Sequence, residues 1–291
     1  MYKQYHLRSY PHADEFPFHI GSELLEGGFP AHGHDFIELT VIFEGRGQHT
    51  INGVPRECHP GDTYVFHRGT VHAFAHAHKL AMMNVMFAPA FLTHLGRDVR
   101  TLPGFQALFV LTARPARTFN CMLNLDPLSL RKIRSLLEHM EQEHRTKSGG
   151  YQTSINGYLT QTIVDLSRLY ATTRTRTAAD AISSHAMAET AALIESTLTQ
   201  PHTVASMASA AHMSRRHFFR LFVKAFGTPP TQYILHKRLD RAAELLTNQR
   251  LRITEAAFES GFSDSNYFTR QFVKRYGMSP RAFRKLKPLL N

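Results

Sequence analysis

The sequence contains no tryptophan and only two cysteines among its 291 residues. Cys58 and Cys121 stand in different segments of the chain, without the spacing of a metal site or of a redox pair. This excludes chemistry that depends on clustered cysteines. We interpret both thiols as structural, and a cytosolic chain would keep them reduced.

Long apolar runs are also missing. No stretch reaches the roughly 18 apolar residues of a membrane-spanning helix, and Met1-Tyr-Lys-Gln-Tyr-His lacks the apolar core of a signal peptide. The sequence therefore predicts no membrane partner and a cytoplasmic location. The length suffices for two domains, and an apolar fraction of 43% is ordinary for a globular protein.

Acidic residues are scarce in the C-terminal part. Residues 186–291 hold 16 Lys and Arg against 7 Asp and Glu, a net charge of +9, whereas residues 1–185 hold 18 against 16, a net charge of +2. A basic excess of this kind supplies affinity for nucleic-acid phosphates, and that affinity falls steeply with salt.

A stretch of this basic part nearly repeats itself fifty positions later. Ser214-Arg-Arg-His-Phe-Phe-Arg-Leu-Phe-Val-Lys returns as Asp264-Ser-Asn-Tyr-Phe-Thr-Arg-Gln-Phe-Val-Lys. Each copy begins with a helix N-cap residue, carries aromatics at helical spacing and ends at glycine followed by proline. A short helix rich in small apolar residues is predicted ahead of each copy, over 204–211 and 253–260. The sequence therefore predicts two helix-turn-helix units, whose second helices enter the major groove.

A long amphipathic helix that starts at Pro229 and Pro230 is predicted to join the two units. Its apolar stripe consists of Tyr233, Ile234, Leu239, Ala242, Ala243, Leu245 and Leu246. A rigid connection of this kind would present both recognition helices to successive major grooves on one face of the duplex, roughly 34 Å apart.

The candidate DNA-binding residues lie between the apolar positions of the two recognition helices. They are Arg215, Arg216, Phe219, Arg220, Ser265, Asn266, Thr269 and Arg270. Arg216 and Arg270 suit guanine or phosphate, and Asn266 suits adenine. The alternative is that the repeat is ordinary helical core with a solvated face. That interpretation holds for Phe218 and Phe222 and their equivalents, whereas the charge asymmetry favours DNA binding by the arginines.

Ser214–Phe226, Arg238–Leu246, Gly261-Phe-Ser-Asp264, Tyr267-Phe-Thr-Arg270 and Gly277-Met-Ser-Pro280 together carry a family resemblance. Across residues 186–286 the chain resembles the AraC/XylS family of bacterial transcription regulators. The resemblance implies an all-α domain with two helix-turn-helix motifs that binds double-stranded DNA. His212 and Ala256 depart from the family pattern and suggest looser packing.

The N-terminal part is predicted to be β. Residues 37–43 alternate in polarity, Gly45 and Gly47 mark a turn, and Asn52-Gly53 is a strong hairpin signal. The flanking and following strands are predicted over 48–51, 54–58, 63–66, 71–75 and 80–87. Many short strands with regular turns indicate a small β-barrel or jelly roll.

His32-Gly-His34-Asp-Phe-Ile-Glu38, followed by Gly45, Gly61 and His67-Arg-Gly-Thr-Val-His72, resembles the double motif of the cupins. In metal-binding cupins the corresponding positions, here His32, His34, Glu38 and His72, converge inside the barrel. Such a set suits Mn, Fe, Ni or Zn, but it also suits sugar hydroxyls or a structural polar core. His67 and His76 depart from the proline and asparagine that are usual in cupins.

The wider pattern, from His32 to Asn84-Val-Met-Phe and onward through Leu102-Pro-Gly-Phe, resembles the sensor domains of the rhamnose-responsive regulators of the AraC/XylS family. This resemblance implies a pocket in the barrel mouth for a small-molecule effector, typically a sugar. The output that it implies is activation of transcription. The same four residues are thus the candidate effector-binding residues and, if a divalent metal is the cofactor, its candidate ligands.

Two segments with helical periodicity, 128–144 and 155–170, follow the β part. We interpret them either as a dimerisation pair or as helices that pack on the barrel. The polar, threonine-rich stretch 172–185 is interpreted as an interdomain linker.

The fold class predicted from these patterns is α+β with two domains. A cupin-like effector-sensing domain is expected over 1–125, a helical pair over 126–171, a linker over 172–185 and a DNA-binding domain over 186–291. The predicted function is a ligand-responsive transcription regulator, an activator, and no catalytic residue is identified. Its expected partners are double-stranded DNA, RNA polymerase, a small molecule such as a sugar, and a second copy of the chain. A metal-dependent cupin enzyme with an accessory DNA-binding tail and a metal-sensing repressor stay open as alternatives.

Overall fold

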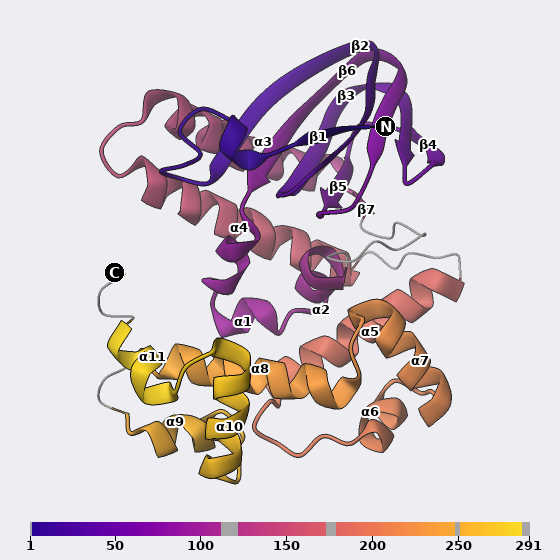
Figure 1. The fold of residues 1–291 in the computed structure, drawn as a ribbon. Coiled ribbons are helices and arrows are strands. Elements are labelled where there is room, and N and C mark those ends of the chain that lie inside the picture. The colour runs from indigo at the N-terminus through magenta and orange to yellow at the C-terminus, as the bar shows by residue number, and fades with distance from the viewer. Residues whose placement is uncertain (1, 112–121, 173–178, 248–250, 287–291) are drawn as a thin grey trace. The chain divides into compact units, whose positions relative to one another are not determined.

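The computed structural model describes residues 2–111, 122–172, 179–247 and 251–286 (Figure 1). The chain divides into two compact units, Met1–Ala188 and Glu189–Asn291. Among the described residues, no helix is long and apolar enough to cross a membrane.

The first unit is built around one curved sheet. Among the described residues its strands are β1 (Lys3–Tyr5), β2 (Phe18–His34), β3 (Ile37–Ile51), β4 (Val54–Cys58), β5 (Asp62–Phe66), β6 (His72–Phe87) and β7 (Met122–Asn124). The hydrogen-bonded order is β1-β2-β6-β3-β5-β7, with β4 paired to β3. The long strands β2, β6 and β3 arch over together in Figure 1. This sheet is the cupin-like β-domain that the sequence predicts.

The predicted hairpin is confirmed, because β3 and β4 pair directly and the turn residues Asn52 and Gly53 have φ of 50° and 82°. The predicted turn at Gly45 and Gly47 is wrong. Both glycines lie within β3, where the pairing with β6 shifts register three times between Ile42 and Gln48. Gly45 has φ of 82°, and a Cβ there would lie 2.1 Å from the carbonyl oxygen of Lys79. These bulges bend the strand without ending it.

Two further predictions for the β part need correction. The separate strands predicted over 71–75 and 80–87 form one strand, β6, which bends through the same bulges. Strand β2 has no counterpart in the prediction, because its sequence includes four glycines, one proline and several exposed polar residues in place of a regular alternation.

Two long helices cover one side of the sheet. Helix α3 (Pro127–Thr146) begins at Asp126, whose carboxylate accepts hydrogen bonds from the backbone N–H groups of Leu128 and Ser129, and α4 (Tyr151–Thr172) follows it. The largest core cluster lies between these helices and the sheet; it includes Leu39, Val41, Val85, Ile133, Leu137, Met140, Ile155, Leu159, Ile163 and Leu166. The apolar residues that suggested dimerisation thus pack within their own domain. A homodimer stays a prediction that would need other surfaces.

Short elements connect the sheet to these helices. They are η2 (Pro89–Thr93), α1 (Arg97–Arg100), α2 (Pro103–Phe105) and η3 (Gln106–Val110), whereas η1 (Leu7–Ser9) lies between β1 and β2. A second core cluster consists mainly of residues from β3, β5 and β6, including Ile42, Ile51, Tyr64, Phe66, Phe74 and Met82. The histidine-rich site described below adjoins this cluster.

The predicted linker is partly helical. Residues 173–178 lie outside the described residues, and from Ala179 the backbone forms α5 (Ala179–Ser196). Alanine recurs through this segment, and its high helix propensity offsets the threonine-rich composition that suggested a linker.

The second unit contains the two predicted helix-turn-helix motifs. Its helices are α6 (Val204–Ala210), α7 (Arg215–Phe226), α8 (Pro230–Leu245), α9 (Ile253–Glu259), α10 (Ser265–Tyr276) and α11 (Pro280–Leu286). Ser214 and Asp264 cap α7 and α10 through their side chains, as expected, and Gly227 and Gly277 end these helices in left-handed conformation. The repeated phenylalanines of both recognition helices are buried, which confirms the core interpretation.

Candidate effector cavity and DNA-binding helices

Three of the four predicted site residues form one compact group inside the first unit. Ring nitrogens of His32 and His72 and a carboxylate oxygen of Glu38 all lie within 4.8 Å of one another. His32 lies near the end of β2 and pairs with His72, the first residue of β6, and Glu38 lies near the start of β3. His34 is outside this group of three, but its Nε2 lies 3.3 Å from Glu38 Oε2.

The hydrogen bonds of the histidines fix which nitrogen faces the site. His32 Nδ1 donates to the carbonyl oxygen of Pro30 at 3.0 Å, and His34 Nδ1 donates to that of Phe36 at 2.8 Å. In a neutral imidazole the other nitrogen, Nε2, then carries a lone pair. His72 Nδ1 lies 3.2 Å from Nε2 of the buried His49 and shares a proton with it.

Burial keeps these imidazoles neutral at physiological pH. It lowers the pKa of His34 to about 4 although the Glu38 carboxylate acts in the opposite direction, and it lowers the pKa of His72 to about 3. Burial also lowers the pKa of His32 and raises that of Glu38.

No hydrogen bond joins the imidazoles of His34 and His72 to the carboxylate at the centre of this group. The Nε2 atoms of His34 and His72 lie 3.3 and 3.4 Å from Glu38 Oε2, and neither nitrogen makes a hydrogen bond within the described residues. Neutral nitrogens facing a carboxylate require a proton, an N–H donor or a metal ion. The donor set therefore fits a divalent metal such as Mn, Fe, Ni or Zn, and it also fits an organic donor.

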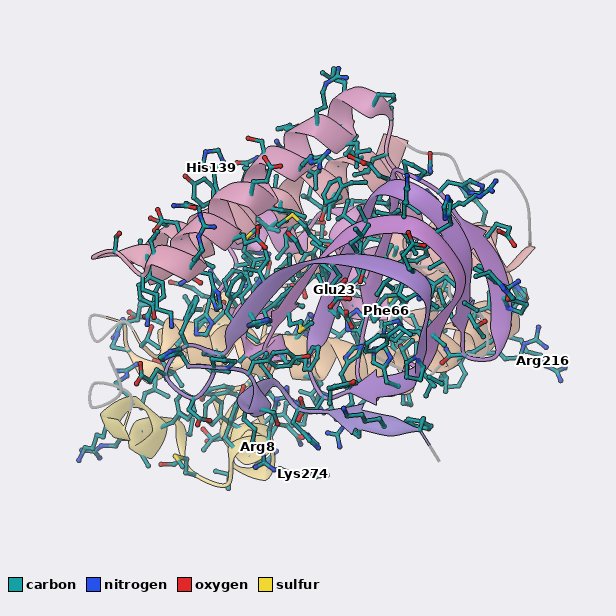
Figure 2. The ribbon with its side chains drawn as sticks, turned by 90° about the horizontal axis from the view of Figure 1, so that it is seen from above. Arg8, Glu23, Phe66, His139, Arg216 and Lys274 are labelled. Atoms are coloured by element: carbon teal, nitrogen blue, oxygen red, sulfur yellow. The ribbon has the colours of Figure 1, made fainter. Side chains whose placement is uncertain are left out.

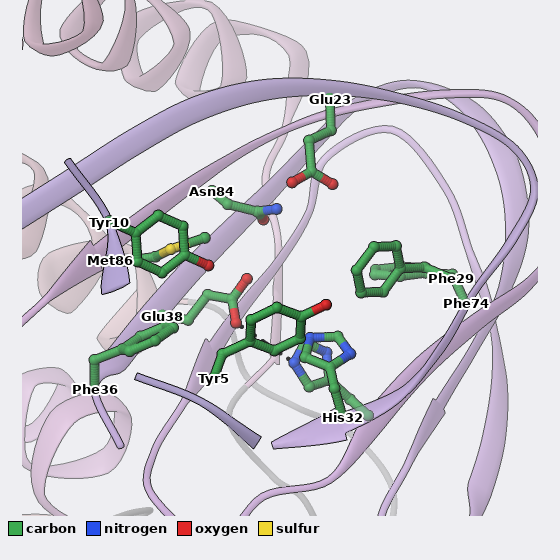
Figure 3. A pocket seen from close by; sticks show the side chains of 11 residues that line it. Tyr5, Tyr10, Glu23, Phe29, His32, Phe36, Glu38, Phe74, Asn84 and Met86 are labelled. Carbon is green, nitrogen blue, oxygen red and sulfur yellow. Dashed lines mark ion pairs between the residues drawn. The ribbon is translucent and has the colours of Figure 1, made fainter. Parts of the chain in front are cut away.

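A cavity of about 60 Å³ opens beside this group (Figure 3). It has room for several water molecules. His32, Glu38 and His72 contribute to its lining, and its other walls are largely aromatic, from Tyr5, Tyr10, Phe29, Phe36 and Phe74. Burial together with the charge of Glu38 raises the pKa of Tyr10 to about 12, so its hydroxyl keeps its proton.

Two polar residues of the cavity were not predicted from the sequence. Glu23 points its carboxylate toward the cavity from β2. The Asn84 amide lies next to it, on the side of Tyr10 and Glu38 (Figure 3). Thr40 donates a hydrogen bond to Asn84 Oδ1 at 2.7 Å and so orients the amide. The cupin-type motif marks only positions near the strand ends, whereas these residues come from strand interiors. No local pattern distinguishes them.

The predicted DNA-binding residues are mostly at the surface of the two recognition helices. Arg215, Arg216, Phe219, Arg220, Asn266, Thr269 and Arg270 are exposed, and Ser265 is half-buried. Figure 2 shows Arg216 extending away from the ribbon. Arg220 is held by a contact of 3.1 Å with His217 Nδ1, and the Thr269 hydroxyl donates to the Ser265 carbonyl oxygen. Arg216 and Arg270 are thus presented for an external partner.

Comparison with known proteins finds two domain families on this chain. The family described as AraC-like ligand binding domain matches residues 19–153, and a helix-turn-helix domain family matches residues 207–286. The chain belongs to the AraC family. It is a helix-turn-helix transcription regulator with a ligand-binding domain, as the sequence predicts.

Relatives of this AraC-family chain align over most of its length. The transcriptional activators RhaR of Escherichia coli K12 and of Shigella dysenteriae are each 27% identical to it over 259 residues, which cover 89% of this chain and 88% of theirs. A crystal structure of the DNA-binding domain of AdpA with a target DNA is 31% identical and covers 34% of this chain and 89% of that chain, with a TM-score of 0.33. A structure of ToxT from Vibrio cholerae is 12% identical over 92% of this chain and 97% of that chain, with a TM-score of 0.35.

In the AraC-type DNA-binding domain, Arg238 connects both helix-turn-helix units. From α8 it donates to the carbonyl oxygens of Leu198 and Gln200, at 3.0 and 2.8 Å, in the segment that leads to α6. The turn of the second unit contacts the same place, because a Cβ on Gly261 would lie 2.9 Å from both Arg238 Nε and the Leu198 carbonyl oxygen. Arg238 therefore fixes how α8 meets both units.

Replacing Arg238 with Ala is expected to weaken binding to a duplex that engages both recognition helices by about tenfold, since orientation of the helices is no longer fixed before binding. Binding to a duplex with one recognition block should change by less than about twofold. Fluorescence anisotropy with the two duplexes measures the difference. Equal losses of affinity for both duplexes would show that Arg238 does not act by orienting the two recognition helices.

Proposed function

We propose that this AraC-family regulator activates transcription in response to a small hydroxylated molecule, of the sugar class, bound in the cavity beside His32, Glu38 and His72. The observation that carries the proposal is the combination of aromatic walls with convergent polar groups, which is typical of small-molecule sites. The printed names of the RhaR relatives support activation as the output. RNA polymerase is then a partner, and the cytoplasm, where both it and the chromosome lie, is the location.

On DNA, the proposed contacts divide between the two recognition helices. Arg216 in α7 and Arg270 in α10 are assigned to guanine edges, and Asn266 is assigned to adenine. The other basic residues of the domain supply phosphate contacts that fix its register on the duplex. Each chain would thereby read two blocks of bases about one helical turn apart.

The effector acts only through a difference in affinity. It must bind the form of the protein that is active on DNA more tightly than the inactive form. The factor by which effector raises the affinity for DNA is then the factor by which DNA raises the affinity for effector. Glu38 and His72 line the cavity and make no hydrogen bond with each other, so an incoming hydroxyl group could bond to both.

The test is a thermal-stability measurement on the full chain after chelation, against a panel of sugars and divalent metals. A ligand present at a hundredfold excess over its dissociation constant stabilises the folded state by about 2.7 kcal/mol. A shift with one sugar, lost in His72→Ala, is the expected result. The control Glu26→Gln changes an exposed residue outside the cavity lining and should keep the shift.

The second candidate function is a metal site, favoured by three buried donors within 4.8 Å of one another. A shift with metal alone, abolished by His72→Ala or His34→Ala, would identify a metal sensor. A bound ion would supply Lewis-acid chemistry, and turnover of a sugar in its presence would indicate a cupin enzyme. We propose a regulator without enzymatic activity, because the RhaR relatives, which align over 89% of this chain, are named transcriptional activators.

A further inference from the structure

The last turn of the second recognition helix carries polar side chains where the first recognition helix carries apolar ones. At the fifty-residue offset of the repeat, Arg275 and Tyr276 in α10 stand where Ala225 and Phe226 stand in α7. Phe226 packs its ring against Tyr233 of α8, at a centroid distance of 4.7 Å. The first recognition helix is thus attached to α8 at this position by apolar contact.

Both polar side chains of α10 bind one carboxylate on α8. Arg275 donates from Nε and Nη2 to Asp240 Oδ1, at 3.0 and 2.6 Å, and the Tyr276 hydroxyl donates to the same oxygen at 2.9 Å. Burial, together with the charge of Asp240, raises the pKa of Tyr276 to about 12, so the hydroxyl keeps the proton that it donates. Three directional bonds to one oxygen hold the end of α10 at a fixed place on α8.

These bonds contribute more to orientation than to stability. The Asp240 side chain is 39% exposed, and solvent screening of an exposed ion pair keeps its contribution to the free energy of unfolding small. Phe268 and Phe272 of α10 pack in one core cluster with Ala242 and Ala243 of α8. Apolar packing is non-directional, so it holds the two helices together without fixing the angle between them.

A small change in this angle moves the base-reading residues by about one base pair. Helix α10 has 12 residues and is therefore about 18 Å long. Its last turn is the anchored end, whereas Ser265 and Asn266 lie in its first turn. A rotation of about 10° about the anchored end displaces the first turn by about 3 Å, close to the rise of one base pair, about 3.4 Å.

We infer that Asp240 is a positioning residue for DNA recognition. Through Arg275 and Tyr276 it fixes the angle of α10 on α8, and thereby the number of base pairs between the two blocks that the protein binds. This inference rests on the proposed reading of two blocks and assigns a residue to their spacing. Arg238 differs from Asp240, since it ties α8 to the segment that leads to α6.

The test measures how affinity depends on the spacing of the blocks. Fluorescence anisotropy at one fixed salt concentration compares a duplex selected by the full-length protein with duplexes in which one base pair is inserted or removed between the blocks. The unmodified protein should bind the altered duplexes at least about tenfold more weakly. In Asp240→Asn, which removes the charge and keeps the shape, α10 can adapt its angle, so this penalty should fall to about threefold or less.

Glu244→Gln is the matched control, because Glu244 lies one turn further along α8 and pairs with Arg241 of the same helix at 3.6 Å. It should keep the full spacing penalty. Arg275→Gln should lower the penalty as Asp240→Asn does. The double variant should have the same penalty as either single variant, because both changes break one contact.

A spacing penalty that Asp240→Asn leaves unchanged would overturn the inference and keep the proposed reading of two blocks. Loss of affinity by the same factor on every duplex would also overturn it, because a residue that only supports folding acts in this way. An unmodified protein that binds all spacings equally well would instead contradict the reading of two blocks itself.

Discussion

The double variant Arg216→Ala, Arg270→Ala should bind a selected DNA site at least about thirtyfold more weakly than the unmodified protein. Each arginine that reads a base is worth about 1–3 kcal/mol, and the two lie on different recognition helices, so their effects should add. Fluorescence anisotropy at one fixed salt concentration, on the selected duplex and on a random duplex, gives both affinities.

The random duplex separates the two roles that an arginine can have. Loss of affinity for the selected site alone means that the side chains read bases, and equal loss on both duplexes means that they contact phosphates. The double variant Arg131→Ala, Arg145→Ala, at two exposed positions in the first unit, is the charge-matched control. Unchanged affinity in the double variant would mean that this face of α7 and α10 does not bind DNA.

Phe222→Ala should lower the free energy of unfolding of the DNA-binding domain by about 3–5 kcal/mol. Phe222 is fully buried, and its ring packs against Phe226 and Tyr233 at centroid distances of 4.3 and 5.4 Å. Truncation therefore leaves a cavity where α7 meets α8. Urea unfolding followed by circular dichroism measures the loss.

Phe219→Ala tests the opposite face of the same helix. Phe219 is 44% exposed, so its truncation should change the free energy of unfolding by no more than about 0.5 kcal/mol, and it should weaken DNA binding. A large destabilisation by Phe219→Ala, or a small one by Phe222→Ala, would reverse the assignment of the two faces of α7.

The DNA-binding domain could be predicted closely because its signals are local and occur twice. Ser214 and Asp264 cap their helices, Gly227 and Gly277 end them, and helical spacing alone separates buried from exposed positions. Each of these signals acts within one or two helical turns, so it can be recognised in the sequence without knowledge of tertiary contacts. The role of Arg238 depends on contacts about forty residues away in the chain, which no local pattern encodes.

The β-domain was predictable in part. The motif placed His32, Glu38 and His72 together correctly, since strand ends in one sheet converge, and Asn52-Gly53 set the hairpin. A glycine in a strand-like sequence can mark either a turn or a β-bulge, and only the pairing with the neighbouring strand distinguishes the two. The continuation of β3 through Gly45 could therefore not be predicted from the sequence. Glu23 and Asn84 reach the cavity through pairing of β2 with β6, which depends on long-range register.

The most direct test of the central claim is selection of duplexes from a random DNA library by the full-length protein. The selection is done with and without the sugar that stabilises the protein in the thermal-stability measurement. The account predicts enriched sites with two blocks of preferred bases about one helical turn apart. It also predicts that effector changes the affinity for these sites and that Arg216→Ala with Arg270→Ala abolishes their enrichment. No enrichment, or enrichment and affinity that do not respond to effector, would contradict a ligand-responsive DNA-binding regulator.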